Sequence, residues 1–215
     1  MLCLTEFKSR KILKDCGFIL PKAFLAKNAN STEKYAKKIG YPVVLKIMSS
    51  DIVHKSDYGC VKTGITNRSE AKFAYHAIIN NALNRNIAAK IDGVSVEETL
   101  SGVELIVGAK QDPQFGPIIL FGIGGVFVEI LKDAAIRLAP IKRKDAKEMI
   151  SEIKGHKLLE GYRGMPQVNL AAVEDALLAA SKLICKHVEI MEMDINPLFA
   201  NEKKAVVGDA RIIIR

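Results

Sequence analysis

The sequence predicts an α+β fold with mixed or antiparallel sheets, and its apolar pattern supports that class. Amphipathic segments with helical spacing alternate with short runs rich in Val and Ile along the chain. In the second half, several such runs follow one another with turns between them, which favours neighbouring strands of one sheet. Two apolar runs joined by the polar turn NEKK close the chain, as is typical of a hairpin.

The first half of the chain predicts three helices and short strands. Thr5 and Ser31 are suitable N-caps, while Gly17 and Gly40 stand where the first two helices should end. The expected elements are, in order, a helix over 5–16, an extended piece over 18–26, a helix over 31–38, strands over 43–47 and 60–65, and a helix over 69–84. We expect the last helix to bury a stripe of apolar side chains, namely Phe73, Ala77, Ile78 and Leu83.

The second half predicts mainly strands, with two helices before the closing hairpin. Asn169 is placed to cap the longer helix, which carries an apolar stripe made of Leu170, Val173, Leu177, Ala180 and Ile184. The expected strands cover 94–99, 103–109, 118–121 and 136–138, a turn covers 112–117, and the shorter helix covers 144–153. Without a long linker or repeat, the pattern favours two lobes joined near residue 95.

The amino-acid composition limits the classes to which the protein can belong. The 215 residues suffice for one domain or two small lobes, and 49% hydrophobic with 26% charged residues is ordinary for a globular chain. The net charge of +8 suits phosphate-bearing ligands, but the basic residues are scattered and aromatics are few, which argues against nucleic-acid binding. Four dispersed cysteines, a charged N-terminal segment and no apolar run fit for a membrane span predict a reduced cytoplasmic protein.

A glycine-rich turn directly follows the apolar run at 118–121. Gly122, Gly124 and Gly125 would leave backbone N–H groups open, as phosphate-binding turns do. The spacing GxGG matches neither the dinucleotide fingerprint nor the Walker motif, so an ordinary tight turn is the alternative. The apolar segments after this turn carry one carboxylate, Glu129, and one cation that looks buried, Arg137.

The closing hairpin predicts a metal site. A turn centred on residues 202 and 203 sets Asn196 opposite Asp209 and Asp194 opposite Arg211, all on one face. An amide oxygen with one or two carboxylates suits Mg²⁺, which completes its coordination with substrate phosphates. The alternative is a solvated strand face, and a turn one residue longer would break the register.

Four further polar residues stand out from their surroundings. Lys46 lies inside an apolar strand, where it is either a phosphate clamp or an edge-strand lysine that extends its ammonium to water. Glu97 and Glu104 could accept hydrogen bonds from ribose or adenine, or could simply be exposed. His54, in a polar loop, is either solvent-facing or a nucleophile toward phosphoryl groups.

Long motifs in this order give the chain a specific resemblance. The segments YPVVLKIMSSDIVHKSDYGCV, VEETLSGVELIVGAKQDPQFGPIILFGIGGVFVEILKD, IRLAP and MDINPLF…GDARI resemble the ATP-grasp β subunits of ADP-forming acetyl-CoA synthetases, within the NDP-forming acyl-CoA synthetase superfamily. The resemblance covers nearly the whole chain. It implies one ATP-grasp domain over 1–215, with a small lobe (19–94), a large lobe (95–215, on which helix 1–18 would pack) and the nucleotide between them.

The resemblance also implies roles for individual residues. His54 would be the phosphorylated histidine, Lys46 the clamp lysine, and Arg137 a cation near the phosphates. The nucleotide-binding set would be Lys46, Glu97, Glu104, Gly122, Gly124 and Gly125. The Mg²⁺ ligands would be Asn196 and Asp209, in agreement with the hairpin argument. Two positions depart from the family pattern, since Ser50 replaces a usual proline and Cys60 a usual glycine.

The implied reaction is acyl-CoA + ADP + Pi ⇌ acid + ATP + CoA. ATP and ADP are substrates, and an α subunit would carry the CoA site and a first phosphohistidine, typically in an α₂β₂ assembly. One alternative is a nucleotide-sensing module associated with a protein acetyltransferase, which should lack the histidine or the metal ligands; both are present. The acid used, ADP versus GDP, and the physiological direction stay open.

Overall fold

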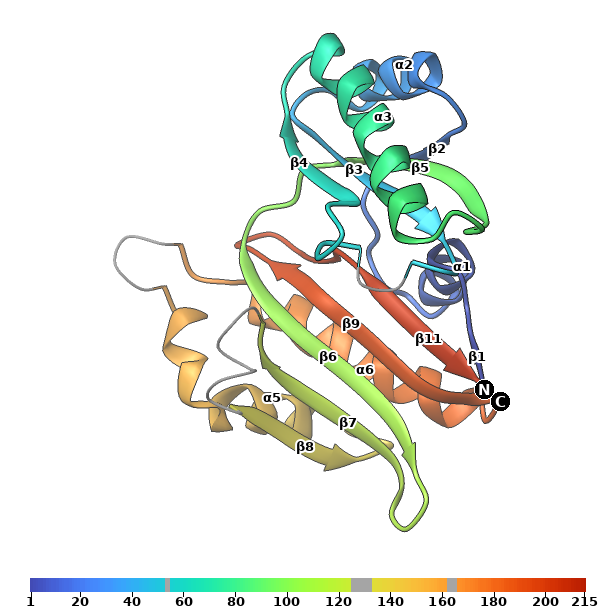
Figure 1. Cartoon of the computed structure of the whole chain (residues 1–215). Helices are drawn as coiled ribbons and strands as arrows, with labels where there is room; N and C mark the ends of the chain where they lie inside the picture. The colour runs from blue at the N-terminus through green and yellow to red at the C-terminus, as the bar shows by residue number, and fades with distance from the viewer. Residues whose placement is uncertain (53–54, 125–132, 162–165) are drawn as a thin grey trace. The chain divides into compact units, whose positions relative to one another are not determined.

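The computed structural model describes residues 1–52, 55–124, 133–161 and 166–215, and these form two compact units (Figure 1). The larger unit comprises Met1–Leu20 and Leu100–Arg215, and the smaller unit comprises Pro21–Thr99. The chain therefore passes between the units at 20/21 and at 99/100. Three residues singled out from the sequence, His54, Gly125 and Glu129, lie outside the described residues.

The smaller unit is a four-stranded antiparallel sheet with two helices packed on it. The strand order is β2 (Ala23–Ala26), β5 (Ile91–Glu98), β3 (Val43–Ser49) and β4 (Val61–Ile65). The helices are α2 (Ala29–Ile39) and α3 (Arg68–Arg85). Alternate residues of β3 and β5 enter the core, so Lys46 and Glu97 lie on the other face of the sheet.

Two expectations for these helices were wrong. Helix α2 begins at Ala29, because Asn28 is the N-cap and Ser31 is its capping-box partner, with Asn28 Oδ1 2.8 Å from Ser31 N. In α3 the buried stripe is Ala71, Ala74, Ile78 and Ala82, whereas Phe73 is 77% exposed and Leu83 38% exposed. Alanines let the helix lie close to the sheet, so the large apolar side chains misidentified the buried face.

The larger unit contains, among its described residues, a seven-stranded sheet. Its main path is β1 (Leu2–Cys3), β11 (Ala210–Ile214), β9 (Ile190–Ala200), β6 (Val103–Asp112), β7 (Gly116–Ile123) and β8 (Ala134–Leu138), and β10 (Ala205–Val207) pairs with β9. Each of these neighbouring pairs is antiparallel, which selects one of the two sheet types that the sequence left open.

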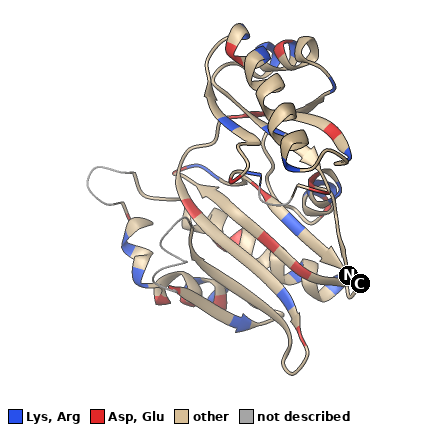
Figure 2. Ribbon diagram, in the orientation of Figure 1, with Lys and Arg blue, Asp and Glu red and all other residues tan. Residues whose placement is uncertain are grey.

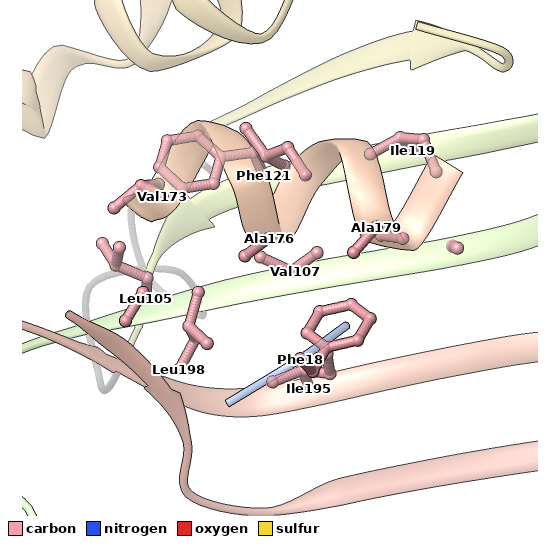
Figure 3. Close-up of a cluster of buried hydrophobic side chains, with 14 of the residues drawn as sticks. Phe18, Leu105, Val107, Ile119, Phe121, Val173, Ala176, Ala179, Ile195 and Leu198 are labelled. Carbon is pink, nitrogen blue, oxygen red and sulfur yellow. The ribbon is translucent and has the colours of Figure 1, made fainter. Parts of the chain in front are cut away.

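Helices cover one face of this sheet. They are α1 (Glu6–Asp15), α5 (Arg143–Glu152), the 3₁₀ helix η1 (Lys154–Leu158) and α6 (Leu170–Lys186). Figure 3 shows α6 running along the strands, with Val173, Ala176 and Ala179 near Phe121 and Val107. Asn169 caps α6 as expected, since its Oδ1 accepts from Ala172 N at 3.1 Å. The other sheet face is therefore the one left for polar side chains.

Charged side chains are distributed over both units without a basic tract. Figure 2 shows lysine and arginine interleaved with acidic residues along helices and strands of each unit. In the part of the chain that the structure describes, no helix combines the length and apolarity that a membrane crossing requires.

Candidate functional site

The register of the large sheet aligns three of the sequence-predicted residues in one row. Gly122 on β7 pairs with Ile106 on β6. Ile106 lies opposite the part of β9 where the pairing register shifts, and this part contains Asn196. Asn196 in turn faces Asp209, whose carbonyl accepts its N–H at 3.2 Å. Because neighbouring strands lie about 4.8 Å apart, the row from Gly122 to Asp209 spans about 14 Å across the sheet.

The hairpin register agrees with the sequence prediction. Arg211 pairs with Asp194 and Ala210 with Ile195, and Asn196 is bonded to Asp209 in the same register. Ile195 is fully buried under the helices while Asn196 is exposed, so the site side chains point to the face that the helices leave open. The expected turn at residues 201–204 therefore has the length on which this arrangement depends.

One feature of this row could not be seen from simple alternation. Leu105 pairs with Leu198 and Val107 with Ile195, so β9 has one extra residue against β6 at Asn196-Pro197. This β-bulge redirects the chain at the predicted metal ligand, as bulges beside active sites commonly do. The sequence does carry a signal for this bulge, because Pro197 has no N–H to donate and yet lies in the middle of an apolar strand.

The donors in the row fit a magnesium ion that shares its coordination with phosphate. Asn196 supplies an amide oxygen, and Asp209 supplies a carboxylate, one oxygen of which accepts from Ala210 N at 2.8 Å. No three His, Cys, Asp or Glu side chains gather as a metal site among the described residues. A hard cation held here would thus take its other oxygen ligands from water and from a bound nucleotide.

Asp194 and Arg211 lie beside this pair on the same face. Burial raises the pKa of the Asp194 carboxyl, although Arg211 opposes that rise. The Arg211 guanidinium donates instead to Glu192 Oε1 at 2.9 Å. The open face next to the row is therefore partly desolvated and carries charges of both signs, a setting in which phosphate binding is sensitive to each charge.

The glycine-rich turn is tied to the start of β6. Gly124 N donates to the carbonyl of Glu104 at 2.6 Å, and a Cβ at Gly124 would lie 3.0 Å from that carbonyl group. A side chain at this position would therefore crowd the backbone of Glu104. This contact also brings the exposed carboxylate of Glu104 to the same end of the sheet as Gly122 and Gly124.

Arg137 is not joined to this row. It pairs with the buried Ile119 across β7 and β8, so it lies on the helix-covered face, opposite to Asn196 and Asp209. Its guanidinium lies 2.5 Å from Glu152 on α5, and this contact raises its pKa. The side chain is 31% exposed, so the expectation of a buried cation was wrong. The sequence predicted helix α5, but it did not indicate that Glu152 of this helix would pair with Arg137.

In the smaller unit the structure brings Lys46 and Glu97 together. Lys46 Nζ lies 3.2 Å from Glu97 Oε2, and the two side chains are 12% and 2% exposed. Strand β3 is paired with both β4 and β5, which excludes the edge-strand alternative for Lys46. The ammonium is thus oriented by a neighbouring buried carboxylate before any ligand binds.

Ser50 and Cys60, the two residues that differ from the family pattern near His54 in the sequence, both fit into the smaller unit. The Ser50 hydroxyl donates to Asp51 Oδ1 at 3.1 Å. Cys60 is fully buried in the small core, where burial raises the pKa of its thiol. Its Sγ lies 3.6 Å from the carbonyl oxygen of Tyr58, so the side chain that replaces glycine packs inside the fold.

Comparisons with known proteins identify the family of this chain. An ATP-grasp domain family matches residues 2–214. The β subunit of acetate–CoA ligase (ADP-forming) I from Pyrococcus furiosus is 46% identical over 212 residues, covering 98% of this chain and 91% of that one. The 4-hydroxybutyrate–CoA ligase (ADP-forming) of Nitrosopumilus maritimus is 45% identical over 93% of this chain but only 29% of its own length.

Solved structures give the same result. Acetyl-coenzyme A synthetase 1 of Ca. Korarchaeum cryptofilum, in complex with coenzyme A, Ca-AMPCP and HgCl⁺, superposes with a TM-score of 0.96 at 43% identity, covering 100% of this chain and 94% of that one. A complex of the same synthetase with coenzyme A and Mg-AMPPCP has its phosphohistidine segment pointing towards the nucleotide-binding site, with a TM-score of 0.86 at 41% identity over 99% of this chain and 93% of that one. With its ATP-grasp fold and its match along nearly the full length of a curated β subunit, the chain belongs to the family of β subunits of ADP-forming acetate–CoA ligases.

Proposed function

We propose that this chain binds Mg²⁺-nucleotide and passes a phosphoryl group between His54 and ADP, as the β subunit of an ADP-forming acyl-CoA synthetase. The observation that carries the proposal is the row formed by Gly122, Asn196 and Asp209 on the open face of the large sheet. It combines a glycine-lined strand end with two oxygen donors of the kind that magnesium prefers.

Within this row, Asn196 and Asp209 would hold the magnesium ion, which would neutralise charge on the nucleotide phosphates. The N–H of Gly124 is already bonded to the Glu104 carbonyl, so in this proposal the other backbone N–H groups of the glycine-rich turn, such as that of Gly125, would serve the same phosphates. Glu104, whose carbonyl accepts from Gly124 N, would accept a hydrogen bond from the nucleoside in this proposal. Phosphoryl transfer needs this kind of positioning and charge neutralisation more than covalent help.

Lys46 and Glu97 supply the corresponding groups of the smaller unit. Glu97 orients the ammonium of Lys46, whose positive charge would then meet the nucleotide phosphates. Once Lys46 is engaged by phosphate, the Glu97 carboxylate can accept from a ribose hydroxyl or the adenine amine. Arg137 would act indirectly in this proposal, because its ion pair with Glu152 holds strand β8 against helix α5.

The reaction in this proposal is one substitution at the acyl carbon followed by three displacements at phosphorus. On the α subunit, phosphate displaces CoA from acyl-CoA, and a histidine then takes the phosphoryl group and releases the acid. A ring nitrogen of His54 accepts that group as the first P–N bond breaks. An oxygen of the ADP β-phosphate finally forms a P–O bond as the P–N bond at His54 breaks, which yields ATP.

Choice of acid belongs to the partner in this proposal. The acetate and 4-hydroxybutyrate ligases resemble this chain almost equally, although their named acids differ. A second polypeptide, the α subunit, therefore supplies the acyl and CoA sites, and we propose an α₂β₂ complex. We also place the complex in the cytoplasm, where reducing conditions preserve thiols such as that of Cys60.

Phosphate incorporation tests the proposal. The chain, assembled with its α subunit, is incubated with γ-³²P-ATP and Mg²⁺, and the label is examined for acid lability and base stability. We expect a phosphohistidine that His54→Asn removes, together with loss of ATP formation from acyl-CoA, while ADP binding is nearly unchanged. Undiminished turnover in His54→Asn would exclude the relay.

A further inference from the structure

A cavity lies among the helices of the larger unit, apart from the row of Gly122, Asn196 and Asp209. Among the described residues, its walls come from α5, from η1 with the two residues that follow it, and from the first two turns of α6. These helices cover one face of the large sheet, whereas the row lies on the other face. The cavity volume is about 350 Å³, near the lower end of the range of about 300 to 1,000 Å³ for ligand pockets, so it suits a small molecule.

The most deeply buried side chains of the cavity, apart from Glu174, are apolar. Ile150 is 5% exposed and Leu159 is fully buried, and both belong to the core of the larger unit. Leu170, at the start of α6, is partly buried and packs against the same core. These three residues form an apolar floor, which favours a ligand that carries an apolar group over a bare ion.

Glu174 contributes a carboxylate that is nearly buried and only partly hydrogen-bonded. Its side chain is 9% exposed, and its Oε2 accepts from Arg143 Nη1 at 3.3 Å. Arg143 donates at a shorter distance, 2.7 Å, to the exposed Asp175. Within the described chain, Glu174 Oε1 has no hydrogen-bond donor. Because buried carboxylate oxygens are normally hydrogen-bonded, this oxygen is suited to a cationic donor held in the cavity.

Two further acceptors line the same cavity. His156 Nδ1 lies 3.1 Å from the carbonyl oxygen of Ile153. A carbonyl oxygen only accepts, so this contact places the proton of the neutral ring on Nδ1 and leaves Nε2 as an acceptor. Glu160 adds an exposed carboxylate. With Glu174, these groups provide three acceptors, which is the number of N–H groups on a primary ammonium.

Helix α5 places a cation beside these acceptors. Arg143 and Lys147 are four residues apart and so share a face of the helix, with Lys147 about 6 Å further along the axis than the residue that contacts Glu174. In the part of the chain that the structure describes, Lys147 lines the cavity and forms no ion pair. Its charge would repel a simple amine but attract a carboxylate on the same ligand.

We propose that this cavity binds an α-amino acid with an apolar side chain. The ammonium group would donate to Glu174 and to the two neighbouring acceptors, the carboxylate would meet Lys147, and the side chain would lie on the apolar floor. The proposal does not depend on the phosphoryl relay, because none of these residues belongs to the proposed nucleotide site.

Calorimetric titration of the full 215-residue chain with three matched ligands tests the proposal. L-Leucine has both charges and an apolar side chain, whereas 3-methylbutylamine lacks the carboxylate and 4-methylpentanoate lacks the ammonium. We expect L-leucine to bind at least about 10-fold more tightly than either analogue, since hydrogen bonds to a charged group contribute about that factor or more. No leucine binding at millimolar concentration, or an analogue that binds as tightly as leucine, would overturn the proposal.

Variants of the two charged residues locate the site. Glu174→Gln keeps the shape of the side chain and should weaken leucine binding by at least about 10-fold. Lys147→Ala alters an exposed residue and should remove the preference for leucine over 3-methylbutylamine. Wild-type affinity in Glu174→Gln, or an unchanged preference in Lys147→Ala, would exclude this cavity as the binding site.

Two controls separate recognition from packing. Arg143→Ala removes the arginine that contacts Glu174 but keeps the carboxylate, so leucine should bind at least as tightly as in the wild type. Glu148→Gln alters an exposed acid of α5 that does not line the cavity and should leave the affinity unchanged. If Arg143→Ala and Glu174→Gln lose affinity equally, with the same fall in melting temperature, the effect is structural and the proposal is wrong.

Discussion

At the scale of single residues, the ion pair of Lys46 and Glu97 shows how a structural role and a catalytic role of the same pair can be distinguished. Both side chains are largely buried on the sheet face opposite the small core, and they lie within ion-pair distance. A buried pair often adds little net stability, yet removal of one partner leaves the other charge uncompensated and costly. A lysine that binds phosphate also has a catalytic role. Its loss lowers the rate of the reaction even in a variant whose folding stability has been restored.

Lys46→Met should therefore reduce the free energy of unfolding by about 3 kcal/mol and lower kcat/KM for ATP formation by about 100- to 1000-fold. In the double variant Lys46→Met/Glu97→Gln the buried charge is gone, so most of the stability should return while the rate stays low. Urea denaturation and steady-state kinetics measure the two effects. Recovery of the rate in the double variant would make the pair purely structural.

The hairpin donors make a second prediction at this scale. Asp209→Ala should raise the Mg²⁺ concentration for half-maximal activity by at least about 10-fold, because one of the two proposed side-chain ligands is lost. Glu202→Gln is the matched control, since it alters an exposed acid in the turn of the same hairpin. A magnesium titration of ATP formation measures the shift, and an unchanged half-saturation point would remove Asp209 from the metal site.

At the scale of elements, the contact between α2 and α3 includes ion pairs that share one carboxylate. Glu33 on α2 lies 2.7 Å from Arg68 and 3.1 Å from Lys72, both on α3. Hydrogen bonding with Lys72, and then the charges of Arg68 and Lys72, lower the pKa of Glu33. The anionic form is therefore favoured in the folded unit, which links the packing of these two helices to pH.

The sign of this dependence follows from the lowered pKa. The contribution of Glu33 is fully present above its unfolded pKa of about 4.3 and is lost as pH falls through the folded value. We expect Glu33→Gln to be less stable than wild type at pH 7, with the difference shrinking as the pH falls below the unfolded pKa of about 4.3. Urea denaturation at several pH values measures it, and a constant difference would contradict the linkage.

At the scale of the whole molecule, the chain has two separate hydrophobic cores. Phe121 is fully buried in the core of the larger unit, whereas Ile47 is fully buried in that of the smaller unit. Each core joins one sheet face to its own helices. Local unfolding should follow this division, since cooperative units of exchange often coincide with such packed substructures.

Phe121→Ala should destabilise the larger unit by about 3 to 5 kcal/mol through cavity formation. Amide hydrogen exchange should then accelerate in β6, β7 and α6, while β3 and α3 keep their protection. Ile47→Ala is the reciprocal variant and should affect the smaller unit. Equal acceleration in both units after either change would show that they unfold as one.

How far the sequence predicts the molecule depends on which interactions act locally. The Asn196–Asp209 pairing was predictable because a short turn fixes the register of a hairpin. The partner of Arg137 was not, because Glu152 reaches it from a helix 15 residues away in sequence. Phe73 on α3 was misassigned for a related reason, since only the packed sheet shows that an alanine stripe is the buried face.

If Asn196 and Asp209 hold the magnesium ion as proposed, the small number of protein ligands has a consequence for energy metabolism. A divalent cation that relies on phosphate oxygens binds together with its nucleotide, so each increases the affinity of the other by the same factor. Free magnesium would then act as a co-regulator of this ligase. ATP offers one more phosphate than ADP, so a rise in magnesium would favour retention of ATP and slow its release in the direction of ATP synthesis.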